Sequence, residues 1–391
     1  MNPFSRRSAH DLDENDLTRA LAVRRARGHV LDLTVSNPTN ARLGVPTLGD
    51  RGRLALSRED VALYEPLPFG LPDTRAAIAE GYAALGEQVS ADDVICTAST
   101  SEAYAWLFSI LADPGDAVFV QVPSYPLFSY LAAYQSVRLL PYPLRYDGAW
   151  HVDLPELRRR VSNEPRARAI LAVSPNNPTG STTKADELAA MLALGLPIVS
   201  DEVFARYPLG DPSRRFTSAV SARSGLTFTL SGLSKEAALP QMKLGWMALA
   251  GDRALVDEAK ARLEILADTF LSVGTPVQRA ARVLLEEAPP VREAIVRRTR
   301  TNLAMLDSML AQTTITRLHV EGGWYATLRL PSVHDEDTWL YAFLEAGVYV
   351  HPASFFDFED APFVVLSLLT PPDDLRQGVA LLRATVEQKI A

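Results

Sequence analysis

The sequence predicts an α/β protein with a mostly parallel central sheet in a large domain and a smaller α+β domain after it. Between residues 93 and 251, short apolar and β-branched runs alternate with longer stretches of helical periodicity. The runs are apolar almost throughout, which is typical of parallel strands covered by helices on both faces. After residue 252 the pattern changes to long helices followed by well-separated short strands, as expected for a second, α+β unit.

The large domain is predicted from strands and helices that alternate in order. Its expected strands are 93–97, 117–122, 137–140, 169–174, 197–200, 226–230 and 245–250. Its expected helices, which separate the first five strands, are 101–112, 126–134, 154–161 and 184–194. A mostly parallel sheet follows, because each strand is joined to the next by a helical crossover.

The second unit is expected to begin near residue 290, where Pro289 and Pro290 interrupt the chain. Its predicted elements, together with the two helices that precede it, are helices 252–271, 276–287, 291–309 and 373–388 and strands 324–330, 348–351 and 364–367. We expect an N-terminal arm over 1–45 that packs with the small domain, a large domain over 46–290 and a small domain over 291–391. The chain shows no internal repeat and no long polar linker.

Composition excludes several classes of protein. The 391 residues are 47% hydrophobic and 22% charged, which is typical of a folded chain and excludes extensive disorder. A formal net charge of −8 argues against a nucleic-acid binder. The single cysteine, Cys96, excludes an intrachain disulfide and a thiolate zinc site, and we expect it to be a small buried hydrophobe. The histidines lack metal-ligand spacing, so no metal site is expected.

No membrane segment is expected. The longest apolar run, 188–199, is too short for a span and is broken by Gly195 and Pro197. The first residues are charged where a signal peptide would be apolar. We therefore expect a cytoplasmic protein.

The first site signal lies where a strand meets a helix, at residues 97–103. Ser99 and Glu102 have capping-box spacing, so a helix is predicted to begin here. Helix capping alone is the simpler interpretation. The free N–H groups and the hydroxyls of Ser99, Thr100 and Ser101 also suit a phosphate.

Three further segments follow predicted strands. Residues 174–180 form a proline-rich loop around Asn177, where ligands bind in parallel sheets. Asp201 ends an apolar strand, where a carboxylate needs a partner. Lys235 follows another strand and small residues, an environment that favours a neutral, nucleophilic amine.

Together these segments closely resemble the class I/II aminotransferases, which are pyridoxal-phosphate enzymes of fold type I. The resemblance covers nearly the whole chain, in the family's order and spacing, and includes a cation eight residues after Lys235, at Lys243. It implies pyridoxal 5′-phosphate as the cofactor, a fold type I architecture and a homodimer with shared active sites.

The resemblance also implies roles for individual residues. Lys235 would form the internal Schiff base and then move the proton between substrate and cofactor as general base and acid. Asp201 would keep the pyridine nitrogen protonated, and Asn177 would bond the phenolic oxygen. The remaining implied cofactor contacts are a ring-stacking Tyr125, a phosphate cradle of Ser99, Thr100, Ser101, Ser234 and Lys243, and Tyr64, which would reach the neighbouring subunit's cofactor.

Three positions depart from the family pattern. Phe204 stands where many members have a tyrosine, and Lys243 replaces the usual phosphate-binding arginine, so the charge is kept but the bidentate fork is lost. Val365 stands at the position of the arginine that binds the substrate carboxylate. Either another cation, such as Arg329 or Arg206, replaces it, or the substrate is not an ordinary α-amino acid.

The sequence therefore predicts an aminotransferase that works by a ping-pong mechanism on an amino donor and an oxo acid. Candidate substrate contacts are Asn37, Asn177, Arg329 and His351. A lyase, decarboxylase or cyclising enzyme of the same fold is the alternative, because the missing arginine leaves the substrate's orientation open. A non-catalytic protein that senses the cofactor is a third interpretation, against which the presence of Lys235 and Asp201 argues.

Overall fold

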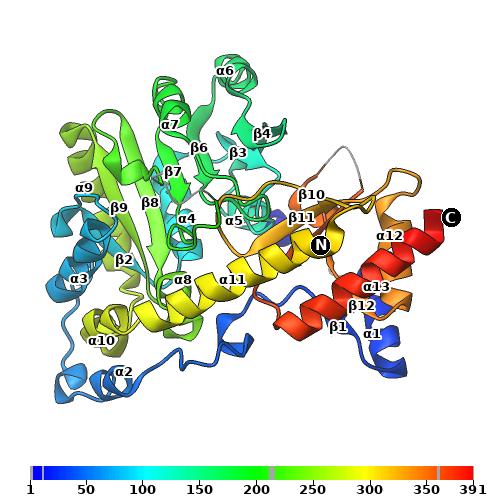
Figure 1. The fold of residues 1–391 in the computed structure, drawn as a ribbon. Coiled ribbons are helices and arrows are strands. Elements are labelled where there is room, and N and C mark those ends of the chain that lie inside the picture. Colours follow the sequence, from blue (N-terminus) through cyan, green and yellow to red (C-terminus); the bar gives the residue numbers. More distant parts are fainter. Residues whose placement is uncertain (1–2, 11–12, 211–215, 359–361, 391) are drawn as a thin grey trace.

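The computed structural model describes residues 3–10, 13–210, 216–358 and 362–390. An eight-stranded sheet forms the centre of the larger part of the molecule (Figure 1). Its strands, in spatial order, are β2 (Val94–Thr97), β9 (Gly245–Gly251), β8 (Leu226–Gly232), β7 (Ile198–Asp201), β6 (Ala167–Val173), β3 (Ala117–Val122), β4 (Arg138–Tyr146) and β5 (Trp150–Val152). β9 and β5 run antiparallel to their neighbours, and the other paired strands are parallel. The mostly parallel sheet predicted from the sequence is confirmed.

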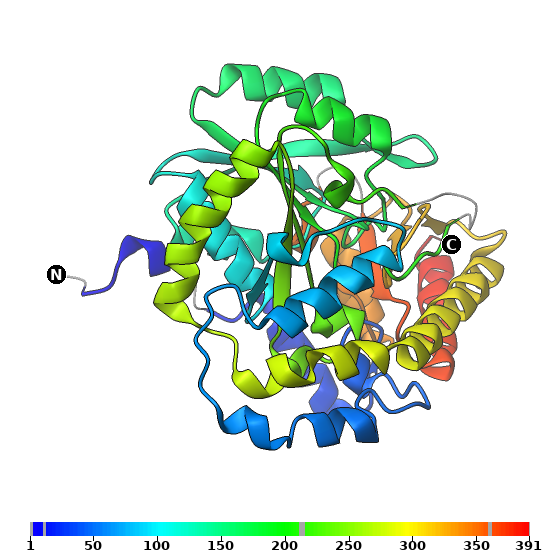
Figure 2. The same ribbon diagram turned by 90° about the vertical axis from the view of Figure 1, so that its left-hand side faces the viewer.

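Helices cover both faces of this sheet. One face packs on α4 (Thr100–Leu111), α5 (Phe128–Tyr134) and α9 (Arg253–Phe270). The other face packs on α3 (Pro72–Ala83), α10 (Thr275–Glu286), α6 (Leu154–Asn163) and α7 (Ala185–Leu192). Successive residues of one strand alternate between the two cores, as Val118 and Phe119 do. Figure 2 shows α3 and α10 on the near side, with α2 (Asp50–Ala55) below them.

A smaller part holds a four-stranded antiparallel sheet. Its order is β10 (Thr316–Arg317), β11 (Tyr325–Arg329), β14 (Phe363–Ser367) and β13 (His351–Pro352). One face of the sheet, with Ala326, Leu328, Val364 and Leu366, forms a core with α11 (Pro289–Leu310), α12 (Glu336–Glu345) and α13 (Pro372–Ile390). The single strand expected at 348–351 is two strands, because β12 (Val348–Tyr349) pairs elsewhere.

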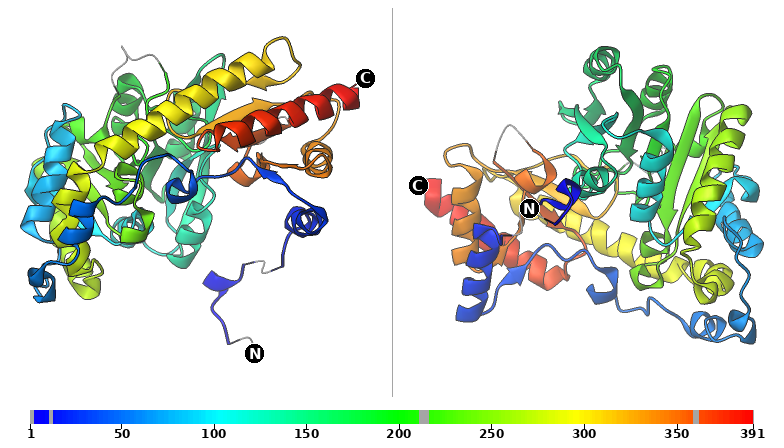
Figure 3. Two further views of the ribbon diagram at one scale, coloured as in Figure 1. Left: turned by 60° about the horizontal axis from the view of Figure 1, so that its bottom comes forward. Right: turned by 180° about the vertical axis from the view of Figure 1, so that it is seen from behind.

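The N-terminal segment crosses both parts. β1 (Leu31–Asp32) pairs in parallel with β12, and α1 (Asp16–Arg27) lies beside α12 (Figure 3). His10 contacts Tyr130 and Tyr134 at the edge of α5, with ring centroids 4.9 and 5.5 Å away. The contacts of β1 and α1 are with small-domain elements, while the exact division at residues 45 and 290 stays a prediction. Within the described residues, no helix combines the length and apolar character needed to cross a bilayer.

Candidate active site

Lys235 lies where the central strand β8 turns into the short helix α8 (Leu233–Glu236). Its Nζ is 4.7 Å from the ring centroid of Trp324 and 5.6 Å from that of Phe204. Burial lowers the pKa of the Lys235 amine to about 8, against a smaller opposing effect of Asp201. A larger fraction of this amine than of an ordinary lysine is therefore neutral, and nucleophilic, near neutral pH.

Asp201 ends the neighbouring strand β7 and is 8% exposed. Its Oδ2 accepts a hydrogen bond from Tyr104 Oη at 2.8 Å, and its Oδ1 accepts one from the Val203 N–H at 3.1 Å. Burial raises the pKa of Asp201, while these hydrogen bonds and the charge of Lys235 oppose that shift. The carboxylate is thus anchored at one side and lies close enough to Lys235 to interact electrostatically.

Tyr125 lies beside this carboxylate. Burial and the negative charge of Asp201 raise the pKa of its hydroxyl, and its side chain remains 42% exposed. Its ring makes an edge contact with Phe128 at 6.0 Å, and Phe128 in turn contacts Tyr104. Phe128 therefore supports the Tyr125 ring, part of which remains exposed.

The loop that carries Asn177 joins the two parts of the molecule. Asn176 Nδ2 donates to the Pro123 carbonyl and to Thr179 Oγ1, both at 2.9 Å, which fixes the loop. Asn177 is 7% exposed, and its Oδ1 has no partner in the described structure. A buried amide group without a partner is costly, so Asn177 fits a site that an additional group completes.

The backbones of Gly180 and Gly322 meet at the end of this loop. The N–H groups of Glu321 and Gly322 both donate to the Gly180 carbonyl, at 2.9 and 3.0 Å. A Cβ at Gly180, where φ is +68°, would lie 2.8 Å from the Gly322 carbonyl oxygen. Only glycine allows this close contact between the two parts.

The start of α4 forms a pocket of backbone N–H groups. Ser99 caps the helix by accepting from the Glu102 N–H at 3.2 Å, and Glu102 accepts from the Ala98 N–H at 2.6 Å. The predicted start of a helix at Ser99 is confirmed, although Glu102 accepts from Ala98 and not from the Ser99 N–H of a full capping box. A Cβ on Gly245 would lie 2.9 Å from the Ser99 carbonyl carbon and 3.0 Å from the Thr100 nitrogen. Gly245 thus lets strand β9 pass directly against the helix N-terminus, where N–H groups favour an anion.

The other predicted phosphate contacts lie around the same point. Ser101 follows Thr100 in the first turn of α4, and Ser234 precedes Lys235 in α8. Lys243 is exposed and adopts a left-handed conformation with φ +50°, two residues before Gly245. Gly232 also lies against Gly245, since a Cβ on Gly232 would be 3.0 Å from the Gly245 Cα. The first turn of α4, the start of α8 and the start of β9 therefore lie close together.

Tyr64 is placed elsewhere. Its side chain is 78% exposed and borders a separate cavity with Leu67, Trp106 and Leu271. No described contact within one chain brings it to Lys235 or Asp201. This position agrees with a residue that acts on another subunit, but does not test that role.

The small sheet presents a mainly uncharged face toward Lys235. Thr327, Val365 and His351 are paired across three adjacent strands, so their side chains share one face. Val365 is fully buried and packs in one cluster with Phe204 and Trp324. His351 stacks on Phe355 at 5.9 Å, and burial lowers its pKa although Asp32 opposes the shift.

The remaining substrate candidates are engaged in other contacts. Asn37 is exposed and caps a short 3-10 helix by accepting from the Thr39 N–H at 3.0 Å. The guanidinium of Arg329 lies 5.5 Å from the Phe363 ring, two positions along β11 from Thr327. Arg206 pairs with Glu236 at 3.1 Å and borders a different cavity. The structure therefore places His351 beside Val365 on the same face of the small sheet, whereas Arg206 lies at a different cavity.

The sequence analysis missed three aromatic residues of this site. Trp324 covers Lys235, Tyr104 holds Asp201, and Tyr207 Oη donates to the Lys235 carbonyl. Tyr104 and Tyr207 resemble ordinary core residues in the sequence. The pair of glycines before Trp324 is the one signal that could have indicated a close approach there.

Comparison with known proteins identifies the family. A model of the aminotransferase class I and II family matches residues 28–384. The chain belongs to this family. The alanine aminotransferase of Pyrococcus furiosus, with 21% identity, superimposes with a TM-score of 0.87 over 98% of this chain and 100% of that chain. The N-succinyldiaminopimelate aminotransferase of Mycobacterium tuberculosis, with 25% identity, gives 0.78 over 94% and 95%. The fold type I prediction is confirmed.

Curated relatives within the family match over a shorter stretch. The glutamate-pyruvate aminotransferase AlaA of Escherichia coli K12 is 29% identical over 231 residues, which is 58% of this chain and 56% of that protein. Nicotianamine aminotransferase 1 of Oryza sativa subsp. japonica is 29% identical over 230 residues, 56% of this chain and 44% of that protein. The chain thus matches about half the length of these relatives.

Proposed function

We propose that this family member is a pyridoxal-phosphate-dependent aminotransferase, which moves an amino group from an amino donor to an oxo acid in two half-reactions. One observation carries the proposal. The half-buried Lys235, whose amine has a pKa lowered to about 8, lies close to the anchored carboxylate of Asp201.

The residues present fit pyridoxal phosphate. Asp201 offers a buried carboxylate to a pyridine N–H, and the buried Asn177 amide is left incomplete by the protein alone. Ser99, Thr100, Ser101 and Ser234 gather hydroxyls and backbone N–H groups where a phosphate would bind. Lys243 adds a positive charge at the mouth of the same cradle.

The protein's part in the chemistry follows from these side chains. When bound, pyridoxal phosphate supplies an aldehyde that condenses with amines and a ring that withdraws electrons. Lys235 Nζ would hold the cofactor and, when free, would act as general base and acid for the proton at the substrate Cα. Tyr125 would limit the movement of the ring, and the hydrogen bond from Tyr104 favours the ionised form of Asp201 against the effect of burial. Trp324 and Phe204 exclude water from the amine.

A homodimer with shared active sites is part of the proposal. Tyr64 is exposed in the single chain, together with Leu63, Leu67 and Phe270, which are between 45% and 78% exposed. Phe270 stacks on Trp106, which borders the same cavity as Tyr64, so these apolar groups gather on one side. We also propose a cytoplasmic location, which a chain with one buried cysteine is suited to.

The decisive test is product analysis with purified holoprotein. The names of the relatives make alanine and glutamate the first amino donors to assay, with pyruvate and 2-oxoglutarate as acceptors. We expect the acceptor's amino acid and the donor's oxo acid in equal amounts by mass spectrometry. Lys235→Ala should abolish both products, while Lys389→Ala, at the end of α13, should leave the rate unchanged.

Other products would change the assignment. Ammonia with an oxo acid, or carbon dioxide, formed without an acceptor would identify the lyase or decarboxylase alternative. Full activity of the Lys235→Ala variant would contradict the whole proposal. Absence of turnover with a broad panel of amines, despite tight binding of pyridoxal phosphate, would support the non-catalytic interpretation.

A further inference from the structure

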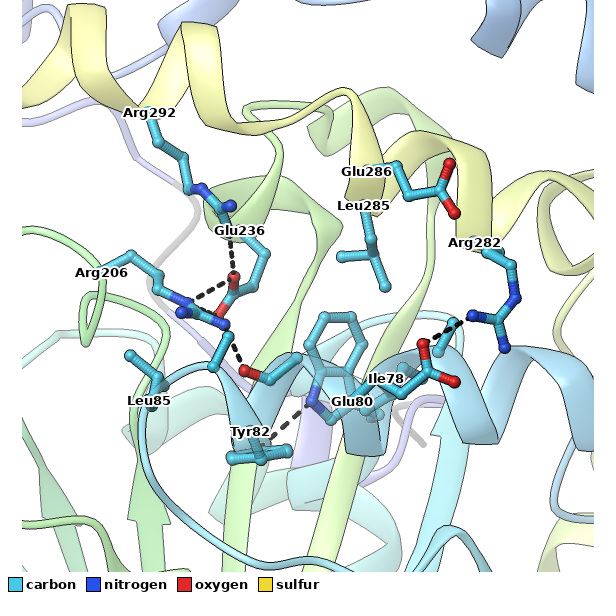
Figure 4. A pocket seen from close by; sticks show the side chains of 14 residues that line it. Ile78, Glu80, Tyr82, Leu85, Arg206, Glu236, Arg282, Leu285, Glu286 and Arg292 are labelled. Carbon is cyan, nitrogen blue, oxygen red and sulfur yellow. Dashed lines mark hydrogen bonds and ion pairs between the residues drawn. The ribbon is translucent and has the colours of Figure 1, made fainter.

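A second cavity lies away from the Lys235 pocket, among α3, α10 and the start of α11 (Figure 4). Its volume is about 210 Å³. Charged side chains stand at its two ends, and apolar side chains lie between them. The residues used below are Ile78, Tyr82, Arg206, Glu236, Trp246, Leu285 and Arg292.

One end of this cavity carries an excess positive charge. Glu236 accepts from Arg206 Nε at 3.1 Å and from Arg292 Nη1 at 3.2 Å, so two guanidinium groups share one carboxylate. The side chains of these residues are only 9–20% exposed. Arg206 is further fixed by donating from Nη2 to the Gly81 carbonyl at 2.7 Å. A partly buried charge that is not neutralised favours an anionic partner.

Arg292 retains donors for such a partner. Only its Nη1 has a hydrogen-bond partner among the described residues, which leaves Nε and Nη2 available. These two nitrogens form the side of the guanidinium that binds a carboxylate with two parallel hydrogen bonds. Figure 4 shows the Arg292 and Arg206 side chains converging on Glu236 at this end.

The middle of the cavity suits an apolar body. Ile78 and Leu285 face one another there, and Trp246 forms part of the wall. Trp246 Nε1 donates to Tyr82 Oη at 3.3 Å, so the indole's polar atom already has a partner. At the far end Arg282 pairs with two carboxylates, Glu80 at 2.6 Å and Asp73 at 2.9 Å. Glu286 pairs with Arg51 outside the cavity, so this end offers no unpaired positive charge among the described residues.

We propose that this cavity is a second ligand site, which takes a small carboxylic acid with an apolar body. The carboxylate binds Arg292 beside Arg206, and the body lies between Leu285, Ile78 and Trp246. The site is distinct from the catalytic pocket, because Glu236 and Lys235 are consecutive on α8 and point about 100° apart. The proposal does not depend on transaminase activity. The ligand would bind beside Glu236, which is the residue after the catalytic lysine.

The test uses 4-bromobenzoate as the probe on the holoprotein. A crystal soaked with the probe and measured at the bromine absorption edge should show a bromine peak between Leu285 and Trp246. Calorimetric titration should give a dissociation constant that rises at least tenfold in Arg292→Gln. Leu285→Trp, which fills the cavity and keeps every charge, should abolish that binding.

The control is Arg297→Gln, about one and a half turns along α11, where the side chain is 67% exposed. It should leave the dissociation constant within twofold of the wild type. Bromine found only in the Lys235 pocket, or binding unchanged in both Arg292→Gln and Leu285→Trp, would overturn the proposal. Absence of any binding up to the solubility of the probe would overturn it as well.

Discussion

At the scale of single residues, the active site depends on groups whose ionisation is set by their surroundings. Asp201 is held by Tyr104 and by a backbone N–H, and Lys235 lies against two aromatic rings. Burial alone would push both toward their neutral forms. The hydrogen bonds to Asp201 oppose this effect but leave its pKa raised, and the amine keeps a lowered pKa, which suits a nucleophile.

Removing the Tyr104 hydroxyl should weaken cofactor binding without displacing Asp201. Tyr104→Phe removes a hydrogen bond to a charged group, worth about 1.5 kcal/mol, so the dissociation constant of pyridoxal phosphate should rise about tenfold. Fluorescence titration of the apoprotein measures it. Tyr142→Phe is the matched control, because Tyr142 Oη donates to the Leu171 carbonyl on the other face of the sheet. Equal affinities in Tyr104→Phe and wild type would contradict this role.

The lowered pKa of Lys235 predicts a pH dependence. The rate at which apoprotein takes up pyridoxal phosphate should increase with pH through a midpoint of about 8, as the amine loses its proton. Because the charge of Asp201 raises the pKa of Lys235, Asp201→Asn should move this midpoint downward. Stopped-flow absorbance at several pH values measures the rate. A midpoint near the ordinary lysine value of about 10.4 would show that the amine is not desolvated.

The lowered pKa of Lys235 also makes the stability of the apoprotein depend on pH. The unfolded chain keeps the lysine proton up to its ordinary pKa, while the native amine releases it from about 8 upward. The unfolded state therefore binds more protons between these values, so this group's contribution to stability increases with pH there.

How far these residues could be predicted depends on their chemistry. Lys235, Asp201 and Asn177 are polar groups after apolar strands, a pattern that core packing does not explain. Tyr104 and Trp324 could not be assigned, because an aromatic residue on an apolar face is indistinguishable from core until its neighbours are known. The sequence showed that Val365 replaces the family's arginine. It could not show where Arg206 points, because that depends on the ion pair of Arg206 with Glu236.

At the scale of elements, the phosphate cradle depends on how closely β9 approaches the start of α4. The sequence predicted both elements to within a few residues, since their periodicity is strong. β4 is much longer than predicted, because Pro141 and Pro143 argue against a strand. Both prolines lie in the stretch where β4 pairs only with β3, since β5 pairs from Leu144 onward.

Gly245→Ala should disturb this contact. The added Cβ would lie about 3 Å from backbone atoms of Ser99 and Thr100, so the strand and helix must separate. Overpacking of this kind costs about 1–3 kcal/mol, and phosphate binding should weaken with it. Thermal unfolding and titration with pyridoxal phosphate measure the two effects.

The matched substitution is Gly274→Ala, where the backbone has φ −63° and the nearest atom outside the adjacent residues is 3.8 Å away. It should leave both the melting temperature and cofactor affinity close to wild type. If Gly245→Ala behaved in the same way, the close approach of β9 to α4 would not matter for binding.

At the scale of the whole molecule, α11 joins the two parts. In its first turn Arg292 lies at the cavity in the larger part, and near its end Leu306 and Leu310 lie in the core of the smaller sheet. The helix was predicted from residue 291, and it begins two residues earlier, because Pro289 and Pro290 are accommodated in its first turn. Which surfaces the two parts present to one another could not be predicted, because it depends on contacts between distant loops.

The exposed apolar side chains around Tyr64 and Phe270 predict that the protein is a dimer. We expect sedimentation analysis to give the mass of two chains. Phe270→Asp, at a side chain that is 58% exposed, should yield monomers and reduce cofactor binding while changing the unfolding of the monomer little. Val333→Asp, 64% exposed in the small domain, is the control and should remain dimeric. A monomeric wild-type protein would contradict the shared active site.

The meeting of Gly180 with Gly322 limits how the catalytic cleft can open. Main-chain hydrogen bonds from Glu321 and Gly322 to Gly180 make this contact, and the Glu321 carboxylate adds to it by accepting from Thr182 and Lys184. Since this junction closely follows Asn177 in the chain, a change in spacing between the two parts here must also displace the Asn177 amide.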